Sequence, residues 1–394
     1  GFGSQTIIPV ILNVEAGRMP AERTLQLAFG WNMVSVNLQP DEEDVTVLTR
    51  PLVEADVLEM MKDGEGHFYN PQFNFNNIPG WSVEQGYLMK LTENAELTLE
   101  GESVLGDDPI QLRDGWQMVS YYPRRPIDAV IAMSGIVDVL ELAKDAAGHF
   151  YNPQFGFSNI GDMRQGQGYL IKVSEDVELV YNLEDERNAN SPIERLGDSQ
   201  LGVVVPTGEN MSLLVKSDEY FNGDFGVYAD GILVGSSCFE GGTCGIAIWG
   251  DDPTTEKTDG ALSGQPLELI MIDDSGEQEV RYSVLQGEST YEINGFWAIQ
   301  LENSQLPAQF GISEVYPNPF NAMLNLRIDI PQASSITIAV YDISGRIVEQ
   351  LVSGKWDTGH HKLVWDASGV SAGVYLIRMN APGFSSVRKA LLVK

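Results

Sequence analysis

The sequence predicts a mostly β, multidomain protein, and three observations carry this prediction. Its 394 residues are enough for three or four domains of ordinary size. The 40 Gly and 19 Pro separate short runs rich in Val, Ile, Thr and Tyr, a pattern typical of strands joined by turns. Several segments occur twice, which indicates tandem units. We expect two tandem β-rich repeat units, a β-sandwich and a C-terminal Ig-like β-sandwich.

Three segments recur at a nearly constant spacing. They are GHFYNPQF, QGYLMKL or QGYLIKV, and GWNMVSV or GWQMVSY, whose copies begin at Gly66 and Gly148, Gln85 and Gln167, and Gly30 and Gly115. The first two pairs lie 82 residues apart and the third lies 85 apart, so the second copy has lost three residues ahead of the octapeptide. Each unit has about 75–80 residues, which is enough for a core of its own.

The octapeptide lies just after a predicted turn. DVLEMMKD or DVLELAKD reads as a strand, the Gly of DGEG or DAAG lets the chain reverse, and HFYNP leaves as the paired strand. Alternation would place one set of rings in the core and the other outside. We favour a hairpin that the fold requires, with His67 and His149 at its edge or surface. The alternative is an aromatic platform that contacts a ligand through Phe68, Tyr69, Phe150 and Tyr151.

Polar joints divide the rest of the chain. Strand-like runs with closely spaced turn signals lie between the joints and predict a sandwich. The expected segments are an N-terminal extended strand segment (1–26), repeat unit 1 (27–106), repeat unit 2 (107–184), a linker (185–198), a β-sandwich (199–303), a second linker (304–313) and an Ig-like domain (314–394).

The charge of the chain excludes several partners. Its formal net charge is -32, and residues 1–313 hold 50 acidic against 16 basic side chains, whereas residues 314–394 hold 6 against 8. A surface this negative repels phosphate backbones and anionic lipids, so we expect no nucleic-acid partner. No apolar run reaches the ~18–20 residues of a membrane span. Residue 1 is Gly with no signal-type segment behind it, so we expect a processed product or a fragment.

The two cysteines lie close together in SSCFEGGTCG. The Gly pair between Cys238 and Cys244 would let the backbone reverse. We therefore expect a disulfide across this turn in an oxidising compartment, with two free thiols as the alternative.

An acidic loop, WGDDPTTEKTDGALSG, is the one candidate cation site. Its oxygen donors, of the type that Ca²⁺ prefers, are Asp251, Asp252, Glu256 and Asp259. The loop lacks the spacing and the central Gly of a known calcium loop. We favour a solvated acidic loop and expect no cofactor, with Ca²⁺ as the alternative.

Motifs of enzyme active sites are missing. The sequence has no nucleophile elbow, no Gly-rich phosphate loop, no HExxH and no activating Cys–His pair. His360 and His361 are adjacent in a predicted strand, point to opposite faces and cannot share a metal. We expect no catalytic residues, no cofactor-binding residues, no metal ligands and no enzyme activity.

The last 80 residues carry the most specific signal. Their motifs are YPNPFN at 316–321, VYDISGR at 340–346, GHHKLVWDA at 359–367, AGVYLIR at 372–378 and the terminal KALLVK. With them, residues 315–394 resemble the C-terminal sorting domain of type IX secretion substrates, and the Ig-like module of flagellar hook-capping proteins is similar. Core aromatics at Trp365 and Tyr375 fit a seven-strand sandwich. The GWNMVS…GYLMK units look like modules of large secreted proteins with that domain.

The resemblance implies export through the outer membrane of a Gram-negative-type bacterium and a place at the cell surface. In the family the module is normally removed on export. Its presence here to Lys394 therefore implies either a retained structural domain or the loss of the sorting role. We expect a non-catalytic extracellular structural protein. The alternatives are a module that binds polysaccharide or another surface ligand, and the accessory tail of a larger secreted hydrolase.

The N-terminal segment suggests how such a protein could assemble. QTIIPVILNVEA resembles the closing strand of an Ig-like domain and would leave Ile7, Ile8, Val10, Ile11 and Val14 in water if it stayed alone. It either packs on its own chain or is donated to a sheet of a neighbouring copy, with the C-terminal sandwich as the expected acceptor. Donation from head to tail would produce a homo-oligomer or a filament.

Overall fold

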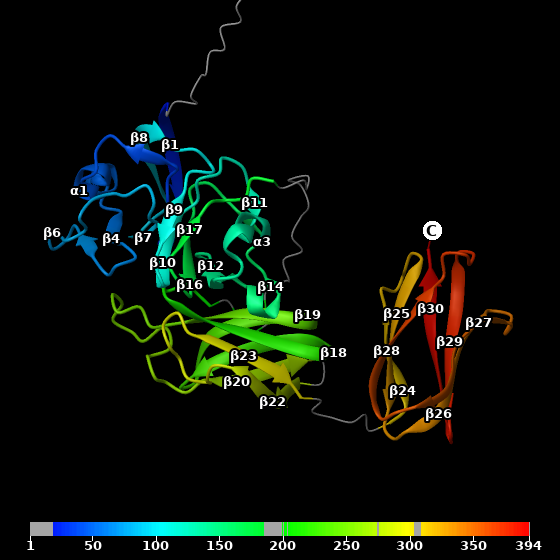
Figure 1. Cartoon of the computed structure of the whole chain (residues 1–394). Coiled ribbons are helices and arrows are strands. Elements are labelled where there is room, and N and C mark those ends of the chain that lie inside the picture. The colour runs from blue at the N-terminus through cyan, green and yellow to red at the C-terminus, as the bar shows by residue number, and fades with distance from the viewer. Residues whose placement is uncertain are drawn as a thin grey trace, which may run out of the picture.

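The computed structural model describes residues 19–184, 199, 201–202, 204–273, 276–302 and 309–393, and these fold mostly into strands (Figure 1). The predicted mostly β, multidomain fold is confirmed. The candidate assembly strand with Ile7, Ile8, Val10, Ile11 and Val14 lies outside the described residues.

The first unit has two sheets around one core. Its elements are β1 (Pro20–Leu27), β2 (Gly30–Val34), β3 (Leu38–Pro40), α1 (Val45–Leu48), α2 (Arg50–Glu54), β4 (Leu58–Lys62), β5 (Phe68–Asn70), β6 (Phe75–Asn76), β7 (Tyr87–Leu91) and β8 (Ala95–Ser103). The sheets have the orders β1-β8-β3 and β2-β7-β4-β5-β6. Strand β1 pairs with β8 along its whole length. The boundary placed at residue 27 is therefore too late.

The second unit repeats this arrangement. Its elements are β9 (Ile110–Leu112), β10 (Gly115–Ser120), β11 (Ile127–Asp128), α3 (Ala129–Ala132), η1 (Ser134–Ile136), β12 (Leu140–Lys144), β13 (Phe150–Asn152), η2 (Pro153–Phe155), β14 (Phe157–Ser158), β15 (Asp162–Met163), β16 (Gly168–Val173) and β17 (Val177–Leu179). Its main sheet, β10-β16-β12-β13-β14, has the strand order of the first unit's five-stranded sheet. The sequence repeat is thus a repeat of the fold.

The octapeptide forms the predicted hairpin in both units. Strand β4 pairs with β5, and β12 pairs with β13. An aspartate at the end of the first strand holds each turn: Asp63 accepts hydrogen bonds from the backbone N–H of His67 and contacts its Nδ1 at 2.7 Å. Asp145 and His149 repeat this contact at 2.8 Å. The histidines therefore serve the turn of their own hairpin.

The central domain (204–302) is one six-stranded sheet in the described residues. Its strands are β18 (Asn210–Ala229), β19 (Ile232–Trp249), β20 (Glu268–Asp273), β21 (Gly276–Glu279), β22 (Tyr282–Gln286) and β23 (Phe296–Leu301). The long β18 pairs with β19, with β20 through its second half and with β23 through its first half. Residues from both halves share one hydrophobic core, so the sheet bends around it.

The predicted disulfide is wrong. Cys238 and Cys244 lie on the same continuous strand, β19, opposite Asp224 and Val215 of β18. Six residues of extended chain separate their Cα atoms by about 20 Å. A disulfide needs Cα atoms closer than about 7 Å. The intervening Gly pair continues the strand rather than reversing it.

The C-terminal sandwich (309–393) contains the seven strands expected from the sequence. They are β24 (Gly311–Tyr316), β25 (Met323–Ile330), β26 (Ser334–Asp342), β27 (Ile347–Trp356), β28 (Gly359–Asp366), β29 (Gly373–Ala381) and β30 (Phe384–Leu392). They form the sheets β24-β25-β28 and β27-β26-β29-β30. The predicted core aromatics Trp365 and Tyr375 are buried between them, with ring centroids 5.4 Å apart.

Candidate functional site

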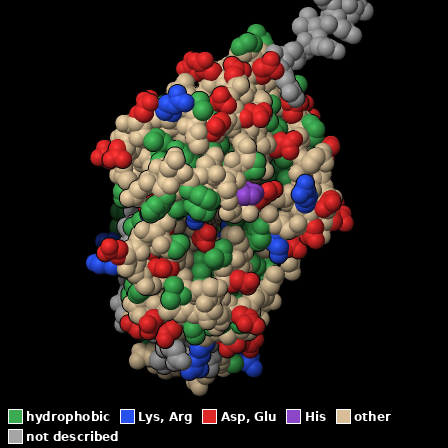
Figure 2. Space-filling view, turned by 90° about the vertical axis from the view of Figure 1, so that its left-hand side faces the viewer, with side chains coloured by type: hydrophobic (Ala, Val, Ile, Leu, Met, Phe, Trp, Pro, Cys, Tyr) green, Lys and Arg blue, Asp and Glu red, His purple; other side chains and the backbone are tan. Residues whose placement is uncertain are grey.

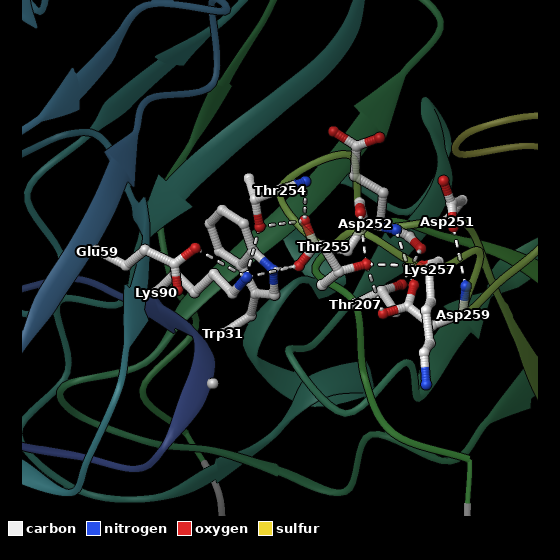
Figure 3. Close-up of polar contacts among 12 residues, drawn as sticks. Trp31, Glu59, Lys90, Thr207, Asp251, Asp252, Thr254, Thr255, Lys257 and Asp259 are labelled. Carbon is white, nitrogen blue, oxygen red and sulfur yellow. Dashed lines mark hydrogen bonds and ion pairs between the residues drawn. The ribbon is translucent and has the colours of Figure 1, made fainter. Parts of the chain in front are cut away.

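The acidic loop of the central domain contacts the first repeat unit (Figure 3). Asp252 Oδ2 accepts a hydrogen bond from Trp31 Nε1 at 2.7 Å and lies 3.1 Å from Lys90 Nζ. The same ammonium lies 3.1 Å from Glu59 Oε1 and donates to Thr254 Oγ1. A cation from the first unit is therefore held between carboxylates from both domains.

Adjacent strands bring the two side chains of the first unit together. Trp31 of β2 and Lys90 of β7 are register partners, so their side chains share one face of the sheet. The loop presents Asp252 through its own bonds: the N–H of Asp252 donates to Asp259, and the N–H of Asp259 donates to Asp251. These bonds within the loop hold Asp252 in place opposite the first unit.

The electrostatics favour the charged forms on both sides of the contact. Burial by itself would raise the pKa of Asp252, but hydrogen bonds from Thr254 and Trp31 hold it below its ordinary value. Burial would lower the pKa of Lys90, yet its bonds to Glu59 and Asp252 raise it. The site is thus a hydrogen-bonded buried ion pair.

The expectation of a solvated acidic loop is wrong at Asp252 but holds for most of the loop, where Glu256 and Asp259 are exposed. Asp252 is 3% exposed and serves the contact between domains, whereas Glu256 is exposed. Within the described part of the chain, no group of three or more His, Cys, Asp or Glu side chains could hold a metal ion. The expectation that Ca²⁺ could bind the loop stays untested.

The second unit meets the central domain through a different lysine. Lys144 Nζ donates to the backbone oxygen of Asn210 at 2.7 Å and to Asn294 Oδ1 at 3.3 Å, and it lies 5.4 Å from the ring centroid of Trp116. Burial lowers the pKa of this lysine to about 7. Both repeat units are therefore attached to the central domain by a lysine that packs beside a tryptophan.

The four candidate ligand-contacting aromatics do not form one platform. Tyr69 and Tyr151 lie in the cores of their own units, and Phe150 is fully buried beneath the central domain. Phe68 alone remains half-buried and stacks on Phe75, with ring centroids 4.7 Å apart. The alternative of a ligand-contacting platform is therefore wrong at the other three positions, because those rings are covered.

Two histidines of the C-terminal sandwich use separate partners. His360 Nδ1 lies 2.5 Å from Asp329 Oδ1, and His361 Nε2 contacts the backbone oxygen of Asp357 at 2.9 Å. A small pocket of about 110 Å³ beside them is lined by Asp218, Glu314, Tyr316, Leu326, Arg327, His360, His361 and Lys362. Arg327 Nη1 lies 3.5 Å from Glu314 Oε1, and Arg327 Nε lies 3.9 Å from Asp329 Oδ1. The charged side chains at this pocket therefore pair with one another.

The sequence interpretation missed Trp31, Lys90 and Lys144. A signal for them was present: Trp31 and Trp116, Lys62 and Lys144, and Lys90 and Lys172 all recur at the repeat spacing. Their partners in the central domain lie far away in the chain, from 66 residues for Lys144 and Asn210 to 221 residues for Trp31 and Asp252.

Comparison with known proteins identifies the last part of the chain. Residues 314–394 match the family described as "Secretion system C-terminal sorting domain". No curated protein matches the chain in sequence.

Solved structures show only faint likenesses. "Dimeric latent PorU from Porphyromonas gingivalis" is 11% identical, with a TM-score of 0.19, over 74% of this chain. This chain spans 32% of that one. A "tetra-tandem repeat in extending region of large adhesion protein" is 9% identical over 91% of this chain and 93% of that one, with a TM-score of 0.16. "The Bacillus anthracis TIE protein" is 10% identical over 95% and 68%, with a TM-score of 0.11. None of these scores supports an argument about fold or activity.

The sorting domain indicates the location of the protein. A type IX sorting domain at residues 314–394 makes this a secreted, cell-surface protein, as the sequence predicted. In the described residues, no helix is both long enough and apolar enough to cross a membrane.

Proposed function

We propose that this chain is a non-catalytic structural protein of the bacterial cell surface whose copies assemble into a filament. The observation that carries the proposal is the use made of its polar side chains. Asp63 and Asp145 hold turns, while Lys90, Lys144 and Asp252 hold the repeat units on the central domain. These polar groups therefore serve the rigidity of the fold, and we propose that the protein needs no cofactor.

Assembly would use the N-terminal segment as a donated strand. Its apolar side chains, at Ile7, Ile8, Val10, Ile11 and Val14, suit a sheet better than water. The C-terminal sandwich offers an acceptor edge, because β27 pairs with β26 on one side and stands at the end of its sheet. Main-chain bonds along this ten-residue strand would supply affinity. Donation of this kind is heterologous and produces an open polymer.

Removal of the segment tests the proposal. The full chain and a chain lacking residues 1–16 would be compared by light scattering and negative-stain electron microscopy. We expect filaments from the full chain and none from the shortened one. The variant Ile8→Asp/Val10→Asp should behave like the deletion, and Ser4→Ala should behave like the full chain. Filaments that persist without residues 1–16 would exclude donation by this strand.

A further inference from the structure

The two repeat units carry the same aromatic side chains in two different surroundings. The equivalent residues are Phe68, Phe73 and Phe75 in the first unit and Phe150, Phe155 and Phe157 in the second. In the second unit the central domain covers them. The ring of Phe296 lies 5.9 Å from Phe150 and 5.7 Å from Phe155 between centroids. A Cβ at Gly245 would stand 2.8 Å from the rings of Phe150 and Phe157, so the fit is tight.

In the first unit the same surface is open. Phe73 is 75% exposed and Phe75 is 43% exposed, whereas their equivalents Phe155 and Phe157 are half-buried. Phe68 is half-buried, whereas its equivalent Phe150 is fully buried. The glycines of the two octapeptides show the same contrast. A Cβ at Gly148 would lie 2.3 Å from Ala247 Cβ, whereas a Cβ at Gly66 would meet nothing within 4 Å. Figure 2, which faces the side where β4 and β6 lie, shows hydrophobic side chains with acidic ones around them.

We call this surface the open aromatic face and define it by Phe68, Phe73 and Phe75. Its rings already have the arrangement that the covered copy shows. Phe68 and Phe75 are tilted by 33° at 4.7 Å, and Phe150 and Phe157 are tilted by 48° at 5.1 Å. A partner would therefore meet a preformed surface and would lose little free energy in ordering it.

The covered copy shows what kind of surface fits these rings. The central domain covers them with the face of a sheet: Leu214 of β18, Gly245 of β19 and Ala298 of β23 lie against the second unit. A basic side chain stands at the margin, since Lys216 Nζ lies 5.8 Å from the ring centroid of Phe155. The matching occupant is thus a sheet face with aliphatic and small side chains beside a basic group.

The C-terminal sandwich carries such a face on β29 and β30. Leu376 stands opposite Lys389, and Arg378 stands opposite Val387, so aliphatic and basic side chains alternate across the two strands. Leu376 is 36% exposed and Val387 is 48% exposed. The charges are complementary, because residues 314–394 have a small basic excess whereas the rest of the chain is strongly acidic.

We propose that the open aromatic face of one copy binds the outer face of β29 and β30 in a second copy. The two surfaces differ, so the contact is heterologous. By itself it joins copies into reversible oligomers, whereas filaments require the donated strand as well. It rests on the proposed function in one respect, that copies of this chain associate. It uses neither the N-terminal strand nor the β27 edge, so it can stand if strand donation fails.

Sedimentation velocity over a range of concentrations tests the contact, both in the full chain and in the chain lacking residues 1–16. Phe73→Ser/Phe75→Ser removes one surface, and Leu376→Glu/Val387→Glu removes the other. Phe29→Ser is the matched control, because Phe29 is 68% exposed in the same unit but outside this face. We expect each double variant to self-associate at least tenfold more weakly than its parent in both backgrounds, and the control to match its parent. If Phe73→Ser/Phe75→Ser unfolds, the single variant Phe73→Ser, at the most exposed ring, replaces it in the experiment.

A mixing experiment identifies the occupant. Each double variant keeps one intact surface, so equal amounts of the two should form a 1:1 complex that does not grow further. If the mixture stays monomeric, or if Leu376→Glu/Val387→Glu associates as its parent does, the C-terminal sandwich is not the partner. A parent chain lacking residues 1–16 that is monomeric at 100 μM, a concentration chosen as about a hundred times a micromolar Kd, would overturn the inference and leave strand donation untouched. The inference would also be overturned, and strand donation left untouched, if deletion of residues 1–16 abolished filaments while Phe73→Ser/Phe75→Ser associated as strongly as its parent.

Discussion

Ser35 and Ser120 occupy equivalent positions in the two repeat units, and each donates its hydroxyl to a backbone carbonyl of the other unit. Ser35 bonds to the oxygen of Gln167 at 2.6 Å, and Ser120 bonds to the oxygen of Gln85 at 2.8 Å. The acceptors are themselves equivalent residues of the repeat. The two units therefore pack reciprocally, around a shared cluster formed by Met33, Leu88 and Met118.

This reciprocity predicts a loss of stability from a substitution on either side. Ser35→Ala and Ser120→Ala each remove a fully buried donor and leave a carbonyl without that bond, which costs about 1–3 kcal/mol of unfolding free energy. Ser35 Oγ also accepts from the backbone N–H of Tyr121 at 3.2 Å, so we expect a loss for both variants, and the larger one for Ser35→Ala, in urea denaturation monitored by tryptophan fluorescence. A loss confined to one variant would show that the two contacts are not equivalent.

The buried ion pair between domains can be compared with an exposed pair at the same repeat position. Lys90→Met leaves Asp252 buried without its cation, and we expect a loss of about 3 kcal/mol, the low end for breaking a buried pair, because Trp31 still donates. Lys172→Met breaks an exposed pair with Glu141 and should cost under about 1 kcal/mol. Differential scanning calorimetry measures both. Equal losses of unfolding free energy in the two variants would mean that the buried ion pair stabilises the protein no more than the exposed pair does.

Lys144 predicts how stability depends on pH. Burial lowers its pKa in the folded state to about 7, while the unfolded chain has a value of about 10.4. Between these values the unfolded state binds a proton that the folded state does not, so this lysine makes stability rise with pH across that window. The difference in unfolding free energy between wild type and Lys144→Met should therefore increase from pH 7 to pH 10.

Lys90 is the control for that measurement. Its folded pKa is raised, so its contribution is fully present below the unfolded value and is lost only as pH rises through the folded value. The difference between wild type and Lys90→Met should stay flat from pH 7 to pH 9. Parallel profiles for the two lysines would contradict the assignment of Lys144.

The cysteines should react as two thiols of very different accessibility. Cys244 is buried, and burial raises its pKa to about 12, whereas Cys238 is half-buried and donates to Asp224 at 3.0 Å. Without reductant, intact mass spectrometry should show two alkyl groups on the unfolded chain. On the folded chain at pH 8, alkylation should occur at Cys238 and not at Cys244. A chain that takes up no alkyl group when unfolded without reductant would restore the disulfide.

The sequence was most informative where signals are local or repeated. The hairpin of the octapeptide and the sandwich core at Trp365 follow from alternation and turn residues. The Gly pair between the cysteines misled, because a glycine in a strand can serve close packing as well as a turn. Nearby Gly245 shows that use, since the rings of Phe150 and Phe157 fill the space of a side chain.

The contact between Asp252 and the first unit could not be foreseen. It joins residues more than 150 positions apart, and the local pattern of the loop is that of any acidic surface segment. Burial of Asp252 depends on how two separately encoded domains meet, which local periodicity does not encode. The same reason explains why Phe75 is exposed while Phe157 packs against the central domain. The two residues are equivalent in the repeat, but the surfaces that surround them differ.

Assembly of copies through the N-terminal strand is the central claim, and a peptide supplied separately tests it most directly. A labelled peptide of residues 1–16 would be titrated into the chain lacking those residues and followed by fluorescence anisotropy, with a scrambled peptide as control. The account predicts saturable 1:1 binding of the native peptide, no binding of the scrambled one, and arrest of filament growth when the native peptide is added to the full chain. Equal anisotropy for both peptides, with filaments growing unchanged, would contradict it.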